Sequence, residues 1–255
     1  MKGKGRFCIA AALAMGLFSP AAVQAKEMHS WGYEGENGPA KWGTLSPEYR
    51  MCSEGRNQSP IDLGPNVVVA KAGLAMPRPD YGKARATAVV NNGHTIKVEV
   101  AKGGTLSIGK HAYRLLQFHM HAPSENTVEG KHFPMEIHFV HADDAGNLAV
   151  IGVMVKEGAE NPVFGKIWEK MPAQKGKADL DLSGKEIASL ITDAKAFYRF
   201  NGSLTTPPCS EGVVWVVLKK PLELSAGQIE TFRKTMGFAN NRPTQPLNAR
   251  IVVSP

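Results

Sequence analysis

Residues 113–121 (YRLLQFHMH) and 135–141 (MEIHFVH) carry the pattern that decides the fold class. In both stretches apolar side chains alternate with polar ones, which is the period of a half-buried β-strand. His119 and His121 are two positions apart, so a strand would place both imidazoles on one face, about 6.7 Å apart along the chain. A helix would aim them to opposite sides. We therefore predict two strands whose polar faces both carry histidine.

Short strand patterns continue on either side of these stretches. Further strands are predicted at residues 88–90, 95–100, 106–108, 148–155 and 213–218. Asn91-Asn92-Gly93, between the first two, favours a hairpin turn. This pattern predicts a mainly β (α+β) fold. We expect a single domain built on a large, mostly antiparallel twisted sheet with small helices at its edges.

Helical patterns are few. One covers residues 162–171, where Pro162 suits the first turn of a helix. Two others begin at capping-box patterns, Ser183-x-x-Glu186 and Ser225-x-x-Gln228, and Gly237 is a natural stop for the last of them.

Composition excludes several classes of protein. The chain has 255 residues, of which 43% are hydrophobic and 21% are charged. Those values are ordinary for a globular protein and exclude a disordered chain, a coiled coil and a multi-span membrane protein. Lys and Arg are scattered, so neither nucleic acid nor a membrane surface is an expected partner.

The N-terminal 25 residues have the pattern of a secretory signal peptide. Three cations in the first six residues precede an uncharged run at 8–18, which is too short to span a bilayer. Val23-Gln24-Ala25 offers small residues for cleavage. We expect residues 1–25 to be removed, which leaves a periplasmic or secreted domain at 26–255 with no stable membrane insertion. An uncleaved anchor is the alternative.

Two cysteines, Cys52 and Cys209, follow the signal. In an exported chain such a pair favours one disulfide, and two free thiols are the alternative.

The histidines of the two central strands can form a metal site. His138 shares a predicted strand face with Glu136 and would add a third imidazole to His119 and His121. Three His ligands leave the fourth position of Zn²⁺ open for water, which is the layout of a catalytic site. Gln117 and Glu136 are suited to orient ligating rings. A set of buried structural histidines is the alternative at this point.

Six segments, taken together, resemble the α-class carbonic anhydrases in sequence and in order. They are residues 56–61 (RNQSPI), 91–94 (NNGH), 117–126 (QFHMHAPSEN), 136–141 (EIHFVH), 202–209 (GSLTTPPC) and 240–247 (NNRPTQPL). The resemblance runs from about residue 31 to residue 251. Asn126 departs from it, because a histidine is often found there, and so does Lys97, where Asn or Gln is common.

The resemblance implies a role for each residue of the site. Zn²⁺ would be held by His119, His121 and His138, with the rings oriented by Gln117, the Asn240 carbonyl and Glu136. Thr205 would accept a hydrogen bond from zinc-bound hydroxide and donate one to Glu125. His94 would be the proton shuttle. The carbon dioxide pocket would be lined by Val140, Val150, Leu204, Thr206, Val213 and Trp215. Cys52 and Cys209 match the disulfide pair of secreted members.

The function implied is reversible hydration of carbon dioxide to bicarbonate and a proton, without an organic cofactor. Two alternatives are kept. His119-x-His121-x3-Glu125 also fits the first metal motif of cupin barrels, in which the Glu is a ligand. A non-catalytic periplasmic zinc-binding protein on the same fold is the other. Hydration activity measured with and without a zinc chelator separates the three. The sequence leaves the oligomeric state open, a homodimer included.

Overall fold

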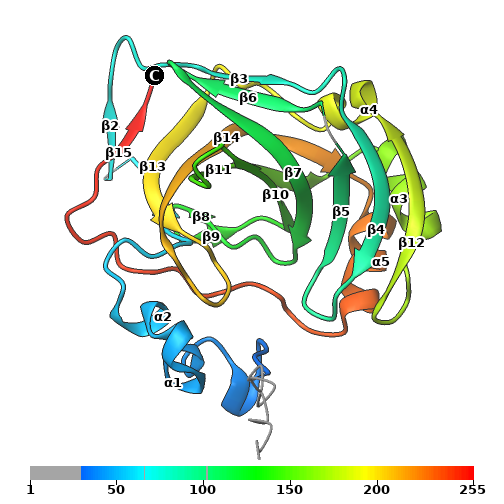
Figure 1. Ribbon diagram of the computed structural model, residues 1–255, viewed down its shortest axis with the longest axis horizontal. Coiled ribbons are helices and arrows are strands. Elements are labelled where there is room, and N and C mark those ends of the chain that lie inside the picture. Colours follow the sequence, from blue (N-terminus) through cyan, green and yellow to red (C-terminus); the bar gives the residue numbers. More distant parts are fainter. Residues whose placement is uncertain (1–29, 66, 102) are drawn as a thin grey trace, which may run out of the picture.

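The computed structural model describes residues 30–255 except residues 66 and 102, and the predicted signal at 1–25 lies outside the described residues. The described part of the chain contains two β-sheets, one of twelve strands and one of three, together with short helices. Figure 1 shows the large sheet strongly curved, with β10 and β11 near its middle.

The large sheet follows the order β12-β4-β5-β7-β10-β11-β14-β13-β15-β2, and β6 pairs with both β3 and β7. Its strands are β2 (Val68–Ala70), β3 (Pro77–Asp80), β4 (Arg85–Asn91), β5 (Ile96–Ala101), β6 (Thr105–Ile108), β7 (His111–His121), β10 (Met135–Ala142), β11 (Leu148–Glu157), β12 (Gly176–Ser183), β13 (Phe197–Ser203), β14 (Glu211–Leu224) and β15 (Val252–Ser254). The small sheet holds β1 (Asp62–Leu63), β8 (Thr127–Val128) and β9 (Lys131–His132).

The predicted fold class is confirmed, and the large sheet is mixed. Most of its neighbouring strands are antiparallel, but β11 with β14 and β15 with β2 are parallel. Parallel pairs are stable where both faces are covered. β11 and the centre of β14 meet that condition, because both are long apolar runs with mostly buried side chains.

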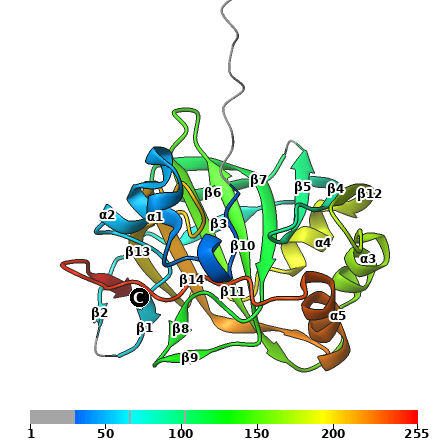
Figure 2. The ribbon, with the colours of Figure 1, turned by 90° about the horizontal axis from the view of Figure 1, so that it is seen from below.

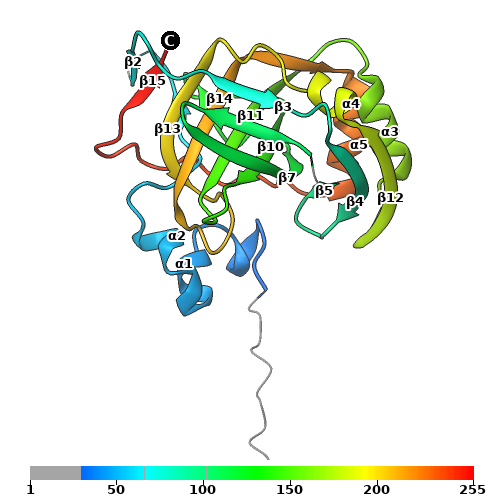
Figure 3. The same cartoon turned by 45° about the horizontal axis from the view of Figure 1, so that its top comes forward.

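Alternation along β7 and β10 separates two environments. Phe118, Met120, Ile137 and Phe139 point to one face and are fully buried in the main hydrophobic cluster. Helices α3 (Pro162–Lys170) and α5 (Ala226–Met236) contribute to the same cluster. Both lie beside β12 at one side of the sheet (Figure 3). The opposite face of β7 and β10 is therefore free to carry polar side chains.

The helix signals in the sequence are confirmed. Helices α4 (Gly184–Ser189) and α5 begin at complete capping boxes, at Ser183 and Ser225. In each, the serine side chain accepts a hydrogen bond from the backbone N–H three residues later, and the side chain of that residue accepts one from the serine N–H. Gly237 ends α5 in the left-handed conformation at φ 75°, which glycine adopts without a steric penalty.

A small separate hydrophobic cluster joins the N-terminal segment to the rest of the domain. This segment contains η1 (Gly35–Asn37), α1 (Trp42–Leu45), η2 (Pro47–Tyr49) and α2 (Met51–Glu54). Trp42 is fully buried against the disulfide between Cys52 and Cys209. In Figure 2 the segment lies in front of the sheet. No helix in the described part of the chain is long and apolar enough to cross a membrane.

Removing the disulfide should destabilise the protein without destroying the histidine cluster. The bond joins residues 157 positions apart. Loop-entropy models assign a loop of that length about 5 kcal/mol, which corresponds to a fall in Tm of roughly 10 °C or more. We expect the Cys52→Ser/Cys209→Ser variant to show this fall in a thermal melt while its metal content is unchanged.

Mass spectrometry of the unreduced, exported protein supplies the control. Its mass should be lower than that of the reduced protein by two hydrogens, about 2 Da. Free alkylation of both thiols in the unreduced protein would contradict the prediction.

Candidate metal centre

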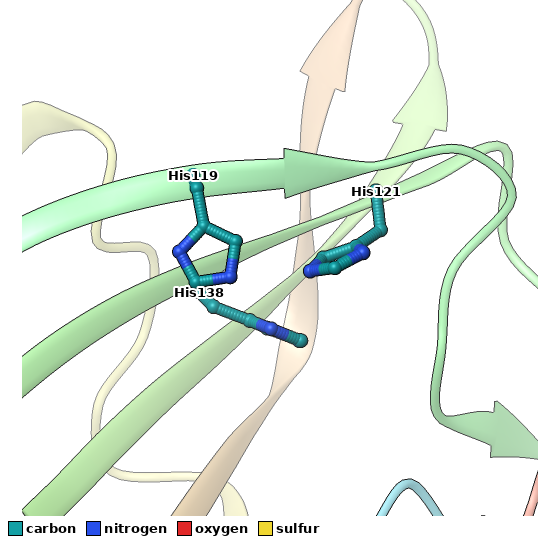
Figure 4. Close-up of side chains that lie close together, drawn as sticks. All are labelled: His119, His121 and His138. Atoms are coloured by element: carbon teal, nitrogen blue, oxygen red, sulfur yellow. The ribbon is translucent and has the colours of Figure 1, made fainter. Parts of the chain in front are cut away.

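The pairing of β7 with β10 brings three histidines together. In this antiparallel pair His119 lies opposite His138, and His121 lies opposite Glu136. One nitrogen from each of the three rings falls within 4.8 Å of the others, close enough to hold a metal ion. Figure 4 shows His119 and His121 extending from one strand toward the His138 ring, which comes from the next.

Each ring has a polar partner on the side away from the cluster. Gln117 Oε1 lies 2.9 Å from His119 Nδ1, and the Asn240 carbonyl lies 2.6 Å from His121 Nδ1. Glu136 Oε1 lies 3.1 Å from His138 Nε2. The His138–Glu136 contact is not aligned as a hydrogen bond, and His138 Nε2 is buried without a hydrogen-bond partner. The ring nitrogens that face away from these three partners are His119 Nε2, His121 Nε2 and His138 Nδ1. Such partners fix both the tautomer and the orientation of a ligating imidazole.

The three rings are neutral at neutral pH. Burial lowers the pKa of His121 to about 4 and lowers the pKa of His119 and His138 well below the ordinary value. Only the neutral imidazole has a lone pair for a metal, so the cluster is in its ligating form.

Unpaired atoms at the centre fit a cation. His121 Nε2 and Glu125 Oε2 are buried without a hydrogen-bond partner, and they lie 3.5 Å apart. Buried polar atoms are rarely left unpaired, and an ion is one of the accepted explanations. Three neutral imidazoles around one point match the donor set of a catalytic Zn²⁺ site.

Glu136 is held as a buried acceptor. Its Oε2 accepts hydrogen bonds from the backbone N–H groups of Glu125 and Asn126, at 2.9 and 2.8 Å. Its Oε1 accepts another from Asn126 Nδ2 at 2.8 Å. Burial raises the pKa of Glu136, and these hydrogen bonds oppose that effect. Asn126, a departure from the family pattern, thus supplies two of the three donors.

Glu125 lies between the histidines and the loop that carries Thr205. Its Oε1 accepts a hydrogen bond from the Arg242 backbone N–H at 2.9 Å, and its Oε2 is 3.7 Å from His138 Nδ1. Burial raises the pKa of Glu125 to about 8, while Arg242 and the Thr205 side chain lower it. A divalent cation at the cluster would further favour the ionised carboxylate.

A cavity of about 150 Å³ opens in front of the cluster. Its walls include His119, His121, Thr206, Lys97 and His94. Lys97 Nζ pairs with Glu99 at 3.1 Å, so this lining cation already has a partner. The predicted shuttle position and the metal cluster therefore share one cavity.

His94 follows a turn built by asparagine side chains. Asn92 Oδ1 accepts hydrogen bonds from the N–H groups of His94 and Thr95, at 2.8 and 2.9 Å. The His94 ring stacks on Trp31 with centroids 3.9 Å apart. Burial, together with nearby Lys175, lowers the pKa of His94. The ring is therefore mostly neutral and able to accept a proton at neutral pH.

The six predicted pocket residues are divided between two places. Thr206 lines the cavity. The other five belong to a second hydrophobic cluster on the histidine face of the sheet: Val140, Val150, Leu204, Val213 and Trp215. The Trp215 ring lies 4.8 Å from the His138 ring, edge to face, so this cluster adjoins the histidines.

Several residues of the site were missed from the sequence. Trp31 and Tyr33 line the cavity from the N-terminal segment, and Arg242 reaches Glu125 from near the C-terminus. The early aromatic residues were a visible signal of a packed segment. Nothing in the local pattern connects these aromatic residues to His94, or Arg242 to Glu125, because each contact joins segments that are far apart in the sequence.

Comparisons with known proteins agree with this geometry. The family model of eukaryotic-type carbonic anhydrases matches residues 37–255. A carbonic anhydrase of Pectobacterium atrosepticum is 44% identical over 250 residues, covering 98% of this chain and 99% of that protein. One of Neisseria gonorrhoeae is 44% identical over 234 residues, covering 91% and 90%.

A solved structure extends the agreement to the fold. The α-carbonic anhydrase of Thermovibrio ammonificans, in complex with the inhibitor sulfanilamide, superposes with a TM-score of 0.83 at 51% identity. The match covers 88% of this chain and 99% of that one. The cupin alternative is wrong, because sequence and fold both match another family. The chain belongs to the eukaryotic-type, or α-class, carbonic anhydrases, the family whose general reaction is the hydration of carbon dioxide.

Proposed function

We propose that this chain catalyses the zinc-dependent, reversible hydration of carbon dioxide to bicarbonate and a proton. The observation that carries the proposal is the cluster of three neutral histidines, each oriented by a polar partner, at the end of a cavity. His119, His121 and His138 would hold Zn²⁺. Bound there, the ion would lower the pKa of a coordinated water to about 7, the value found in carbonic anhydrases themselves, and supply hydroxide at neutral pH.

Thr205 would orient the nucleophile. Its side chain is buried and interacts with Glu125. With a cation bound at the cluster the Glu125 carboxyl group would be ionised, and an ionised carboxylate accepts hydrogen bonds but donates none. The Thr205 hydroxyl must then donate to Glu125 and accept from the nucleophile. That direction leaves a nucleophile lone pair facing the substrate.

The substrate would lie against the apolar side chains beside His138. Val140, Val150 and Trp215 are buried there, with Val213 and Leu204 in the same cluster. A small neutral molecule needs no charged clamp. Among the lining residues of the cavity, all in the described part of the chain, Lys97 carries the only fixed charge, and it is paired with Glu99.

His94 would carry the released proton to buffer. Its ring is half-buried on the cavity wall, and its lowered pKa keeps it ready to accept a proton at neutral pH. We further propose that residues 1–25 direct export to the periplasm or beyond the cell. The disulfide supports this proposal, because such bonds persist in oxidising compartments.

Loss of one histidine should remove most of the affinity for metal. We expect one zinc per chain in the purified protein, and His138→Ala should lose most of its zinc and its hydration activity because two ligands cannot complete the site. Zinc is measured by elemental analysis and hydration by stopped flow. His111→Ala, an exposed histidine on the same strand as His119, is the matched control. Full activity after removal of zinc by a chelator would refute the proposal.

Glu136→Gln should weaken zinc binding while the fold is retained. The Glu136 carboxylate accepts three hydrogen bonds from the backbone and side chain of residues 125 and 126. Glutamine would place an NH₂ group, itself a donor, where one of these N–H groups needs an acceptor. We expect zinc affinity to fall by about 10- to 100-fold, the range found for outer-shell substitutions in metal sites, carbonic anhydrase among them. Competition with a chromophoric chelator measures it. An unchanged affinity would remove Glu136 from the orienting role.

Thr205 and His94 should affect different kinetic constants. Thr205→Ala should lower kcat/KM by on the order of 100-fold, because the nucleophile loses its orienting partner in the hydration step. His94→Ala should leave kcat/KM within about twofold but lower kcat by about tenfold in dilute buffer, because proton transfer becomes limiting. Stopped-flow hydration at low and high buffer concentration separates the two.

Added imidazole is the control for His94. It should restore part of the kcat of His94→Ala, since it can carry the same proton through the cavity. An unchanged kcat at low buffer would exclude His94 as the shuttle. An equal fall in kcat/KM would assign it a structural or binding role instead.

A further inference from the structure

Arg242 has a buried charge that no carboxylate neutralises directly. Its side chain is 1% exposed, and no ion pair among the described residues includes it. Nη1 donates to Gln58 Oε1 and to the Ser59 carbonyl, both at 2.8 Å, and Nη2 donates to the Cys52 carbonyl at 2.8 Å. Burying a charge on neutral acceptors costs stability, even when every contact is well formed. The main effect of such a residue is to hold the segments that carry its acceptors in fixed relative positions, rather than to add to the free energy of unfolding.

The backbone of the same residue contacts the metal centre. The Arg242 N–H donates to Glu125 Oε1 at 2.9 Å, and the other carboxylate oxygen lies 3.5 Å from His121 Nε2. Residues around Arg242 form neither helix nor strand, so no sheet ladder fixes the position of this N–H. The three guanidinium hydrogen bonds fix it instead.

The guanidinium also connects to the loop that carries Thr205. Gln58, which accepts from Arg242 through Oε1, donates through Nε2 to the Cys209 carbonyl at 3.0 Å. The Cys209 N–H in turn donates to the Thr206 carbonyl at 2.9 Å. Cys52, whose carbonyl accepts from Arg242, is the disulfide partner of Cys209. Arg242 is therefore connected by hydrogen bonds both to Glu125 and, through Gln58 and Cys52, to the turn that follows Thr205.

We infer that Arg242 is a positioning residue for the Thr205–Glu125 pair, whose relative placement it sets through its side chain on one side and its backbone N–H on the other. The inference rests on the proposed function, in which that pair orients the nucleophile. This role does not require Arg242 to contact the substrate or the metal. A point donor such as lysine cannot serve three acceptors in the planar arrangement that the guanidinium satisfies.

A double-mutant cycle tests the inference. Arg242→Lys should lower kcat/KM by about tenfold, the size of one charge-assisted hydrogen bond. In a Thr205→Ala background the same substitution should change kcat/KM by less than about twofold, because the pair it positions is already broken. Tm should fall by the same amount in both backgrounds, and zinc content should stay at one per chain.

Arg250→Lys is the matched control. Arg250 is half-buried and, like Arg242, donates to backbone carbonyls, here those of Leu247, Asn201 and Pro246. None of these hydrogen bonds joins it to Glu125 or Gln58. We expect this variant to lower Tm without changing kcat/KM more than about twofold, and with no dependence on Thr205.

The outcomes separate the two proposals. Equal losses of kcat/KM from Arg242→Lys in both backgrounds, or no loss in either, would overturn the positioning role and leave the proposed function intact. Absence of hydration activity in the unmodified zinc-loaded protein would overturn the proposed function itself. If Arg242→Lys does not fold, Gln58→Ala removes one acceptor and leaves Arg242 in place. The same dependence on Thr205, with a loss of about threefold, is then expected, and its absence overturns the inference.

Discussion

The antiparallel pairing of β7 with β10, in which His119 faces His138, is the constraint on which the rest of the site depends. Side chains alternate along both strands, so one register places Phe118 and Phe139 in the main core and the three imidazoles on the opposite face. A slip of one residue would exchange the two sets. The hydrophobic core thus determines on which face the metal ligands lie, because a one-residue slip would turn Phe118 and Phe139 out of the main core.

Carboxylates and an arginine are buried around these histidines, and each is stabilised by contacts from distant segments. Glu136 is satisfied from the turn at residues 125 and 126, and Glu125 from Arg242. In a medium of low dielectric such a network strengthens its own hydrogen bonds, and any member left unpaired would be costly. The buried charged groups therefore favour one arrangement of the surrounding loops. A purely apolar centre would not distinguish that arrangement from others, because apolar contacts are not directional.

Much of the fold was readable from local pattern. Alternation predicted β7 and β10, capping boxes predicted the starts of α4 and α5, and Gly237 marked the end of α5. Local pattern did not predict that β11 and β14 would be parallel neighbours, because pairing partners are chosen by burial across the whole sheet. The same limit applies to the cavity wall. Trp31 stacks on His94 only because the N-terminal segment packs across the sheet.

The sequence by itself determined the strand period, the two same-face histidines of β7 and the third on β10, because these depend on neighbours one to four positions away. Its family motifs also named the residues around them. Tertiary structure alone decided that Asn126 would hold Glu136 and that Arg242 would link Glu125 to the disulfide segment. Those contacts join residues from 10 to 190 positions apart. Which polar groups meet at such separations depends on how the whole chain buries its apolar surface, and no local pattern encodes it.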